Sequence, residues 1–251
     1  MQNRIRVSLC CPLPRIGFGS GELHVSDELL QMDDYLARAK GEIVVFPEGY
    51  LKSEDTDKAY QLARKHNKWL ICGTQDQGEC KSLYTVVIDP DKGLIYSHCK
   101  TALTDGDRKS RAKLGMTIEA LDTPFGKIGT VLCYEMHFPE VARIMCIEGA
   151  WVLFNTIGTG MWHEQQFDEW TTLAKARAIE NRCFVLGTTH YCDPIPMMYA
   201  YDPHGHLIGL KRNYEGIMEV EVDQDKIDER DYFKDRNPEA YTKISTGGKY
   251  E

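Results

Sequence analysis

Three side chains that could do covalent chemistry together are Glu48, Lys100 and Cys133, and each follows a segment with the composition of a buried strand. A cysteine nucleophile needs a base to accept the thiol proton and a cation or N–H group to stabilise the oxyanion formed on attack. Functional side chains in α/β folds collect at the carboxyl ends of strands. The sequence therefore predicts a thiol, a carboxylate and an ammonium group that share one crevice.

Cys133 lies at an abrupt change of predicted secondary structure. Residues 127–132 are rich in β-branched side chains and favour a strand, whereas a helix is predicted to begin at Pro139. A structural cysteine more often faces the core from the middle of a strand and needs no polar neighbours. Cys133 instead lies where the strand gives way to a turn, and Glu135 follows two residues later. This position favours an accessible, reactive thiol.

The elements that must position these residues alternate between strand and helix and are twice interrupted by a hairpin. Two hairpin turns with similar sequences, at 90–93 and 202–205, occur once in each half of the chain and indicate internal two-fold symmetry. Two β/α halves that pack sheet against sheet predict an α/β fold, a four-layer α/β/β/α sandwich. The predicted strands are 4–11, 42–46, 69–74, 83–89, 94–98, 127–132, 151–155, 183–188, 198–201 and 207–210, and the predicted helices are 26–40, 53–66, 139–148 and 164–181.

The composition limits the classes of partner. The 251 residues suit a single α/β domain over 1–251, in which 223–251 form a polar tail that packs on the surface or on a neighbouring subunit. The formal net charge of −8, with both signs mixed along the chain, argues against a nucleic-acid or membrane partner and favours a small-molecule substrate. The chain contains nine cysteines without CxxC pairs, and no apolar run approaches the roughly 20 residues of a membrane span. We therefore expect reduced thiols and a cytoplasmic protein.

Taken together, the motifs resemble those of the nitrilase superfamily of carbon–nitrogen hydrolases. The resemblance is carried, in this order, by Phe46-Pro-Glu48, Lys100 and Gly126-Lys-Ile-Gly-Thr-Val-Leu-Cys133-Tyr-Glu, and extends through 138–143, 174–181 and 228–230. It implies that Glu48 is the general base, that Cys133 is the nucleophile and that Lys100 stabilises the tetrahedral intermediate. The backbone N–H of Tyr134 would complete the oxyanion hole. The resemblance also implies a homodimer or larger homo-oligomer, joined through helices near 139–148 and 170–181, and it requires no metal or cofactor.

The reaction that this resemblance predicts is the hydrolysis of a small non-peptide amide or N-carbamoyl compound, which releases ammonia or an amine. A free cysteine has a pKa of about 8.5, so Glu48 must accept the thiol proton as the bond to carbon forms. The same triad could attack a nitrile and convert it to an acid and ammonia. A non-hydrolytic acyltransferase and a pseudoenzyme of the same fold also remain open.

The chain departs from the superfamily pattern at a second acid. Many members carry another glutamate between the lysine and the cysteine, whereas residues 101–115 contain only Asp105 and Asp107 as acids. We predict that Asp107 takes this place, with Glu119 as the weaker candidate. A carboxylate one methylene shorter would reach Lys100 or the substrate differently, so turnover could be altered.

The segments that follow the predicted strands 127–132 and 151–155 should border the crevice. None of their side chains forms a clear charge clamp, and the basic residues near Asp107 are more often simply solvated, so the charge of the substrate stays open. The glycine-rich stretch at 17–21 is interpreted as a flexible loop, and His190 with Cys192 and Cys183 lacks the second paired cluster of a metal site. The predicted substrate-binding residues are Tyr50, Tyr134, Glu135, His137, Asn155, Thr156, Gly158 and Trp162.

Overall fold

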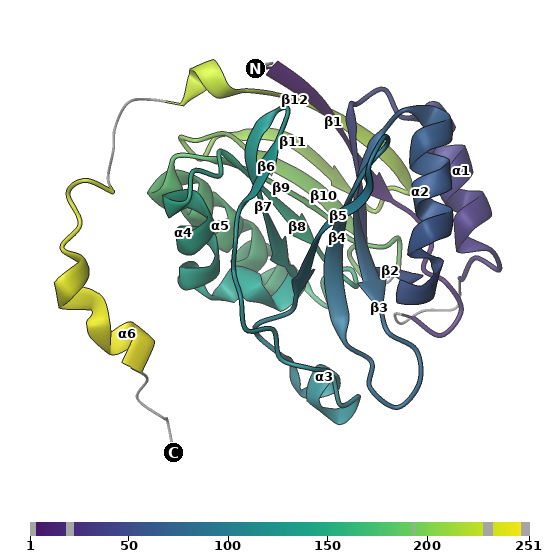
Figure 1. Ribbon diagram of the computed structural model, residues 1–251, viewed down its shortest axis with the longest axis horizontal. Helices are drawn as coiled ribbons and strands as arrows, with labels where there is room; N and C mark the ends of the chain where they lie inside the picture. The colour runs from purple at the N-terminus through teal and green to yellow at the C-terminus, as the bar shows by residue number, and fades with distance from the viewer. Residues whose placement is uncertain (1–3, 19–22, 193, 228–232, 247–251) are drawn as a thin grey trace.

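Two six-stranded sheets pack face to face, and helices cover the outer face of each sheet (Figure 1). The computed structural model describes residues 4–18, 23–192, 194–227 and 233–246. The arrangement confirms the predicted four-layer α/β/β/α sandwich.

The first half of the chain forms the sheet ordered β12-β1-β2-β3-β4-β5. Strands β1, β2 and β3 are parallel, and β4 and β5 form the predicted antiparallel hairpin. The elements of this half are β1 (Arg4–Cys11), α1 (Glu28–Arg38), β2 (Ile43–Lys52), a 3-10 turn (Ser53–Asp55), α2 (Thr56–His66), β3 (Trp69–Gln75), β4 (Leu83–Asp89) and β5 (Gly93–Cys99).

The second half repeats this arrangement in the sheet ordered β11-β10-β9-β8-β7-β6. Strand β12 then returns to the first sheet and pairs antiparallel with β1, as β6 does with β7. The elements are α3 (Asp105–Lys109), β6 (Leu121–Thr123), β7 (Gly126–Leu132), a 3-10 turn (Cys133–His137), α4 (Pro139–Ile147), β8 (Val152–Thr156), α5 (Glu164–Asn181), β9 (Phe184–Thr188), β10 (Met197–Tyr201), β11 (Leu207–Arg212), β12 (Gly216–Asp223) and a 3-10 turn (Gln224–Lys226).

Three apolar layers hold the sandwich together. Strand β2 shows how the sequence builds them, because its side chains alternate between the two faces of the sheet. Val45 packs between the two sheets, whereas Val44 and Phe46 pack under α1 and α2. The third layer lies between the second sheet and helices α4 and α5. The sequence of a parallel strand that is covered on both faces is a nearly continuous run of apolar residues, which explains why these strands are recognisable in the sequence.

The C-terminal segment leaves the sandwich. A 3-10 turn (Pro238–Tyr241) and α6 (Thr242–Thr246) project away from the two sheets (Figure 1). Before them, the ring of Phe233 lies 5.0 Å from the guanidinium carbon of Arg143 on α4. Residues 228–232 and 247–251 of the predicted tail lie outside the described residues, and the first of these ranges contains the motif at 228–230. Residues 19–21 of the glycine-rich loop also lie outside the described residues. Helices long and apolar enough to cross a membrane are absent from the described residues.

Two strands and two helices were not predicted, and several boundaries differ. Strands β6 and β12 and helices α3 and α6 are additional, and α1 is capped by Asp27, whose side chain accepts from the N–H groups of Leu29 and Leu30, rather than by Ser26. The largest difference is in β2, which was predicted to end at Phe46 and continues to Lys52. This extension contains Glu48.

Candidate active site

Glu48 lies on an irregular stretch of β2. The pairing of β2 with β3 shifts register between Phe46 and Leu51, and Pro47 cannot donate to the ladder because it has no N–H. Gly73 of β3 allows the bulge to come close, since a Cβ at position 73 would lie 2.3 Å from the Glu48 Cα. The bulge thus turns a buried carboxylate out of the regular ladder.

Two buried side chains hold the backbone of this bulge. The Nε2 of His190 lies 3.0 Å from the carbonyl oxygen of Glu48. The Nε of Arg15 donates to the carbonyl oxygen of Gly49 over 3.2 Å. Burial lowers the pKa of His190 to about 3, so the ring is neutral, and its Nε2 carries the proton because a carbonyl can only accept. Phe18 packs on both residues, 5.2 Å from the His190 ring and 5.5 Å from the Arg15 guanidinium. These supports were not predicted.

Cys133 occupies the corner expected from the sequence. Strand β7 ends at Leu132, and Cys133 begins the 3-10 turn with a φ of 49°, the left-handed region that non-glycine residues rarely adopt. Its thiol is half-buried. Burial and then the negative charge of Glu48 raise the pKa of Cys133, against the opposing effects of Lys100 and the Gly158 backbone. The resting nucleophile is therefore a thiol that needs a base.

Lys100 lies between two carboxylates. The residue directly follows β5 and is 1% exposed, and its Nζ lies 2.8 Å from Glu48 Oε1 and 2.9 Å from Asp107 Oδ2. Burial by itself would lower the pKa of Lys100, but the negative charges of Glu48 and Asp107, and that of Cys133 once it ionises, outweigh it and raise the pKa. The site therefore holds a permanent ammonium group, which donates a hydrogen bond to Glu48 and forms an ion pair with Asp107.

Asp107 reaches Lys100 from the first turn of α3. The side chain of Thr104 accepts from the Asp107 N–H, and Asp107 Oδ2 accepts from the Thr104 N–H over 2.8 Å, which is a capping box. Asp107 Oδ2 is thus shared between Thr104 and Lys100. The Thr-x-x-Asp spacing is a helix-start signal that could have located α3 from the sequence. Glu119, the weaker candidate, is exposed.

Four predicted substrate-binding residues have their polar atoms paired inside the protein. The Tyr50 hydroxyl donates to the Glu28 carbonyl under α1, and Thr156 is bonded to Thr85 of the first sheet over 2.8 Å. Asn155 donates to the Val131 carbonyl and accepts from Trp170 and Tyr199. Glu135 is fully buried and bonded on both oxygens. Their polar atoms are therefore engaged within the protein, and their contact with substrate stays a prediction.

The other predicted residues lie at the surface or beside the base. The Tyr134 and His137 rings stand 5.0 Å apart on the turn after Cys133, and Trp162 is 55% exposed. Gly158 lies close to the base, since a Cβ there would come within 2.5 Å of Glu48 Oε2 and 3.4 Å of Phe18. A side chain at 158 would therefore fill space next to the carboxylate that faces the thiol.

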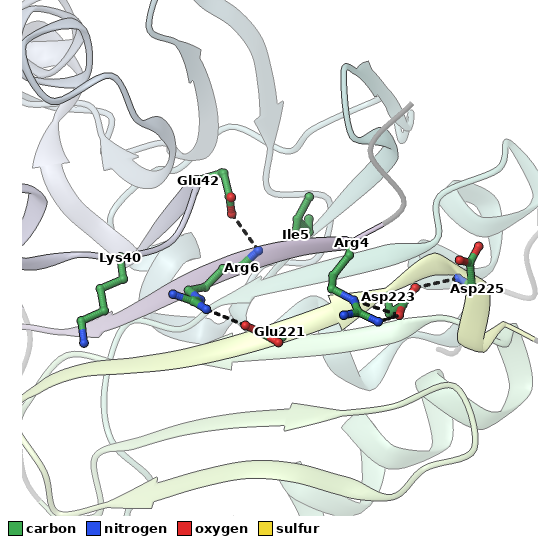
Figure 2. A pocket seen from close by; sticks show the side chains of 8 residues that line it. All are labelled: Arg4, Ile5, Arg6, Lys40, Glu42, Glu221, Asp223 and Asp225. Atoms are coloured by element: carbon green, nitrogen blue, oxygen red, sulfur yellow. Dashed lines mark hydrogen bonds and ion pairs between the residues drawn. The ribbon is translucent and has the colours of Figure 1, made fainter.

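A pocket on the surface of β1 and β12 is separate from these residues (Figure 2). Arg4 pairs with Asp223 over 2.7 Å and Arg6 with Glu221 over 2.6 Å, so its charges are largely paired with one another. Neither the thiol nor Lys100 lines this pocket. We assign it no catalytic role.

Comparisons with known proteins agree with this geometry. The family model described as carbon-nitrogen hydrolase matches residues 29–232. A probable nitrilase of Schizosaccharomyces pombe is 31% identical over 199 residues, which are 73% of this chain and 71% of that protein. An omega-amidase of Xenopus laevis is 28% identical over 201 residues, 71% and 70% of the two chains. The fold of a carbon-nitrogen hydrolase from Helicobacter pylori G27 superposes with a TM-score of 0.85 at 18% identity and covers 99% of this chain and 100% of that one.

Proposed function

Because this chain belongs to the carbon-nitrogen hydrolase family, we propose that it hydrolyses a small non-peptide amide through an acyl-thioester on Cys133. The observation that carries the proposal is the contact of the buried Lys100 ammonium with both Glu48 and Asp107, beside a thiol in a left-handed corner. This set supplies a nucleophile, a base and a cation.

In the first half-reaction, Glu48 accepts the thiol proton as the Cys133 sulfur bonds to the amide carbon. The raised pKa of Cys133 makes this transfer necessary at neutral pH. The negative charge that develops on the amide oxygen is stabilised by Lys100 and by the backbone N–H of Tyr134. The protonated Glu48 then gives its proton to the nitrogen, the carbon–nitrogen bond breaks, and ammonia leaves a thioester on Cys133.

In the second half-reaction, Glu48 removes a proton from a water molecule that attacks the thioester carbon. The carbon–sulfur bond breaks, the sulfur regains a proton, and the carboxylic acid leaves. Asp107 takes the role of the second acid by holding the Lys100 ammonium together with Glu48. Every step uses groups of this chain, the substrate and water.

Among substrates, we propose a terminal primary amide. The support is the description of relatives from frog, mouse and yeast as omega-amidases and of another mouse relative as a deaminated glutathione amidase. N-carbamoyl compounds and nitriles are the competing classes. An acyltransferase would release one equivalent of ammonia as the thioester forms, and more only when an amine acceptor takes the acyl group in place of water.

The test is ammonia release from a panel of terminal amides of dicarboxylic acids, simple amides, N-carbamoyl amino acids, ureido amines and nitriles. We expect the wild-type protein to release ammonia from the terminal amides. From the other substrate classes we expect no more ammonia than the background measured with Cys133→Ala. Ammonia from nitriles alone would make the protein a nitrilase. A thioester that forms with the release of one equivalent of ammonia and then persists in water, but turns over with added amines, would make it an acyltransferase.

We also propose a homodimer or larger assembly formed through α4 and α5. Ile144 and Ile147 on α4 and Ile179 on α5 are exposed apolar side chains. Phe233 of the C-terminal segment contacts Arg143 on α4. The 3-10 turn and α6 that follow project from the sandwich, so they could extend over a second copy (Figure 1). Sedimentation equilibrium should give at least twice the chain mass of 28.7 kDa, and a purely monomeric sample would contradict this.

The nine free cysteines support a reducing compartment, which we propose to be the cytoplasm.

A further inference from the structure

Glu135 connects the two segments that carry Lys100 and Cys133. The side chain is 0% exposed. Its Oε1 accepts from the N–H and the hydroxyl of Thr101 over 2.6 and 2.7 Å, and its Oε2 accepts from the Leu132 N–H over 2.7 Å. The Nε2 of His98 lies 3.0 and 2.9 Å from the two oxygens.

The residues that bond to Glu135 are neighbours of Lys100 and Cys133 in the chain. His98 lies on β5 of the first sheet, and Thr101 directly follows Lys100 beyond the end of that strand. Leu132 is the last residue of β7 in the second sheet and directly precedes Cys133. Strands β5 and β7 belong to different sheets, so no shared hydrogen-bond ladder fixes the ammonium relative to the thiol. A single carboxylate bonded to both segments does so.

We propose that Glu135 is a positioning residue, whose buried carboxylate sets the distance between the Lys100 ammonium and the Cys133 sulfur. This inference rests on the proposed function, since it assigns Lys100 and Cys133 to the same reaction. A shift of about 1 Å between reacting groups can cost about 100-fold in rate. Each bond to Glu135 therefore supports the chemistry without touching the substrate.

The electrostatics of Glu135 agree with this role. Burial would raise its pKa, but the bonds from His98 and Thr101 outweigh burial and lower it. The group is thus a carboxylate at neutral pH, and both oxygens accept. Only an ionised carboxylate can accept from the Leu132 and Thr101 N–H groups at once, because a glutamine of the same shape presents one NH₂ group to a donor.

The variant Glu135→Gln tests the proposal. The NH₂ group of the glutamine must face either the Leu132 N–H or the Thr101 N–H, and two donors cannot bond to each other. One of the two segments therefore loses its hydrogen bond to residue 135. We expect kcat for the amide to fall about 100-fold while KM changes less than about threefold, because the substrate contacts remain. Thr101→Val, which keeps the backbone N–H and loses the hydroxyl bond, should lower kcat about tenfold. This second variant decides the question if Glu135→Gln does not fold.

Asp89→Asn is the matched structural control. Asp89 is also buried and accepts from the N–H groups of Asp91 and Lys92, but it does so in the turn between β4 and β5. We expect it to lower the melting temperature and to leave kcat per folded molecule unchanged. If folded Glu135→Gln and Thr101→Val also keep the wild-type kcat, the positioning role is wrong.

A second readout separates this inference from the proposed function. The rate at which iodoacetamide alkylates Cys133, followed by peptide mass, reports the thiol environment without turnover. Lys100 lowers the pKa of Cys133, so displacing the ammonium in Glu135→Gln should move the pH profile of alkylation to higher pH. An inactive wild-type protein would refute the proposed function, whereas an unchanged alkylation profile in the variant would refute the positioning role.

Discussion

Replacing Cys133 by alanine should lower ammonia release from the amide substrate by at least about 10⁴-fold. The reason is that the proposed reaction breaks the carbon–nitrogen bond only after sulfur has bonded to the carbon. Glu48 and Lys100 remain in the variant, but water would have to replace a positioned nucleophile. A coupled ammonia assay with the variant at high enzyme concentration measures the loss, and circular dichroism checks that the fold is kept.

The matched control is Cys80→Ala. Cys80 is an exposed cysteine and has no contact with the three proposed catalytic side chains among the described interactions. We expect it to keep wild-type activity, which would show that the loss in Cys133→Ala comes from the position of the thiol rather than from the removal of any cysteine. Full activity in Cys133→Ala would exclude the thioester mechanism.

Replacing Glu48 by glutamine should lower kcat by about 10³- to 10⁴-fold, the upper part of the range for general acid–base catalysis. Glutamine keeps the shape of the side chain and can still accept a bond from Lys100 through its oxygen. It cannot take the thiol proton, which the raised pKa of Cys133 keeps in place at neutral pH. Steady-state and single-turnover rates with one amide would show whether thioester formation is the step that slows.

Asp107→Asn is the informative comparison, because it also removes a negative charge from beside Lys100. Asp107 contacts the ammonium at 2.9 Å and is held by Thr104. As it supports the lysine and does not take the proton from sulfur, we expect a smaller loss of about 100-fold. A larger loss in Asp107→Asn than in Glu48→Gln would mean that the two carboxylates have the opposite roles.

Much of the fold could be predicted because its strands are buried on both faces and its helices carry clear boundaries. Strands 4–11 and 83–89 and helix 164–181 have the predicted bounds. The additional strand β12 pairs with β1 at the opposite end of the chain, and its partner cannot be read from local periodicity. Strand β2 was cut short at Pro47 because a proline normally ends a strand, whereas here it introduces the bulge that carries Glu48.

The candidate site was predictable only in part, for physical reasons. Lys100 and Cys133 each follow a strand, and Glu48 follows the regular part of β2, so their common position could be recognised. The sequence could not say that Glu135, two residues after Cys133, turns inward on a 3-10 turn to meet Thr101. Nor could it show that Arg15 and His190, far from Glu48 in the chain, hold the backbone of the bulge. These contacts depend on how the two sheets pack, and packing is not a local property.

The central claim is that Cys133 forms an acyl-thioester, and intact mass spectrometry of the wild-type protein during turnover tests it most directly. Rapid acid quenching after mixing with a terminal amide should show an added mass equal to the substrate minus ammonia. Peptide mapping should place it on Cys133, together with one equivalent of ammonia released in the first turnover. Ammonia release with Cys133 unmodified at every time point, or an adduct on another cysteine, would contradict the account.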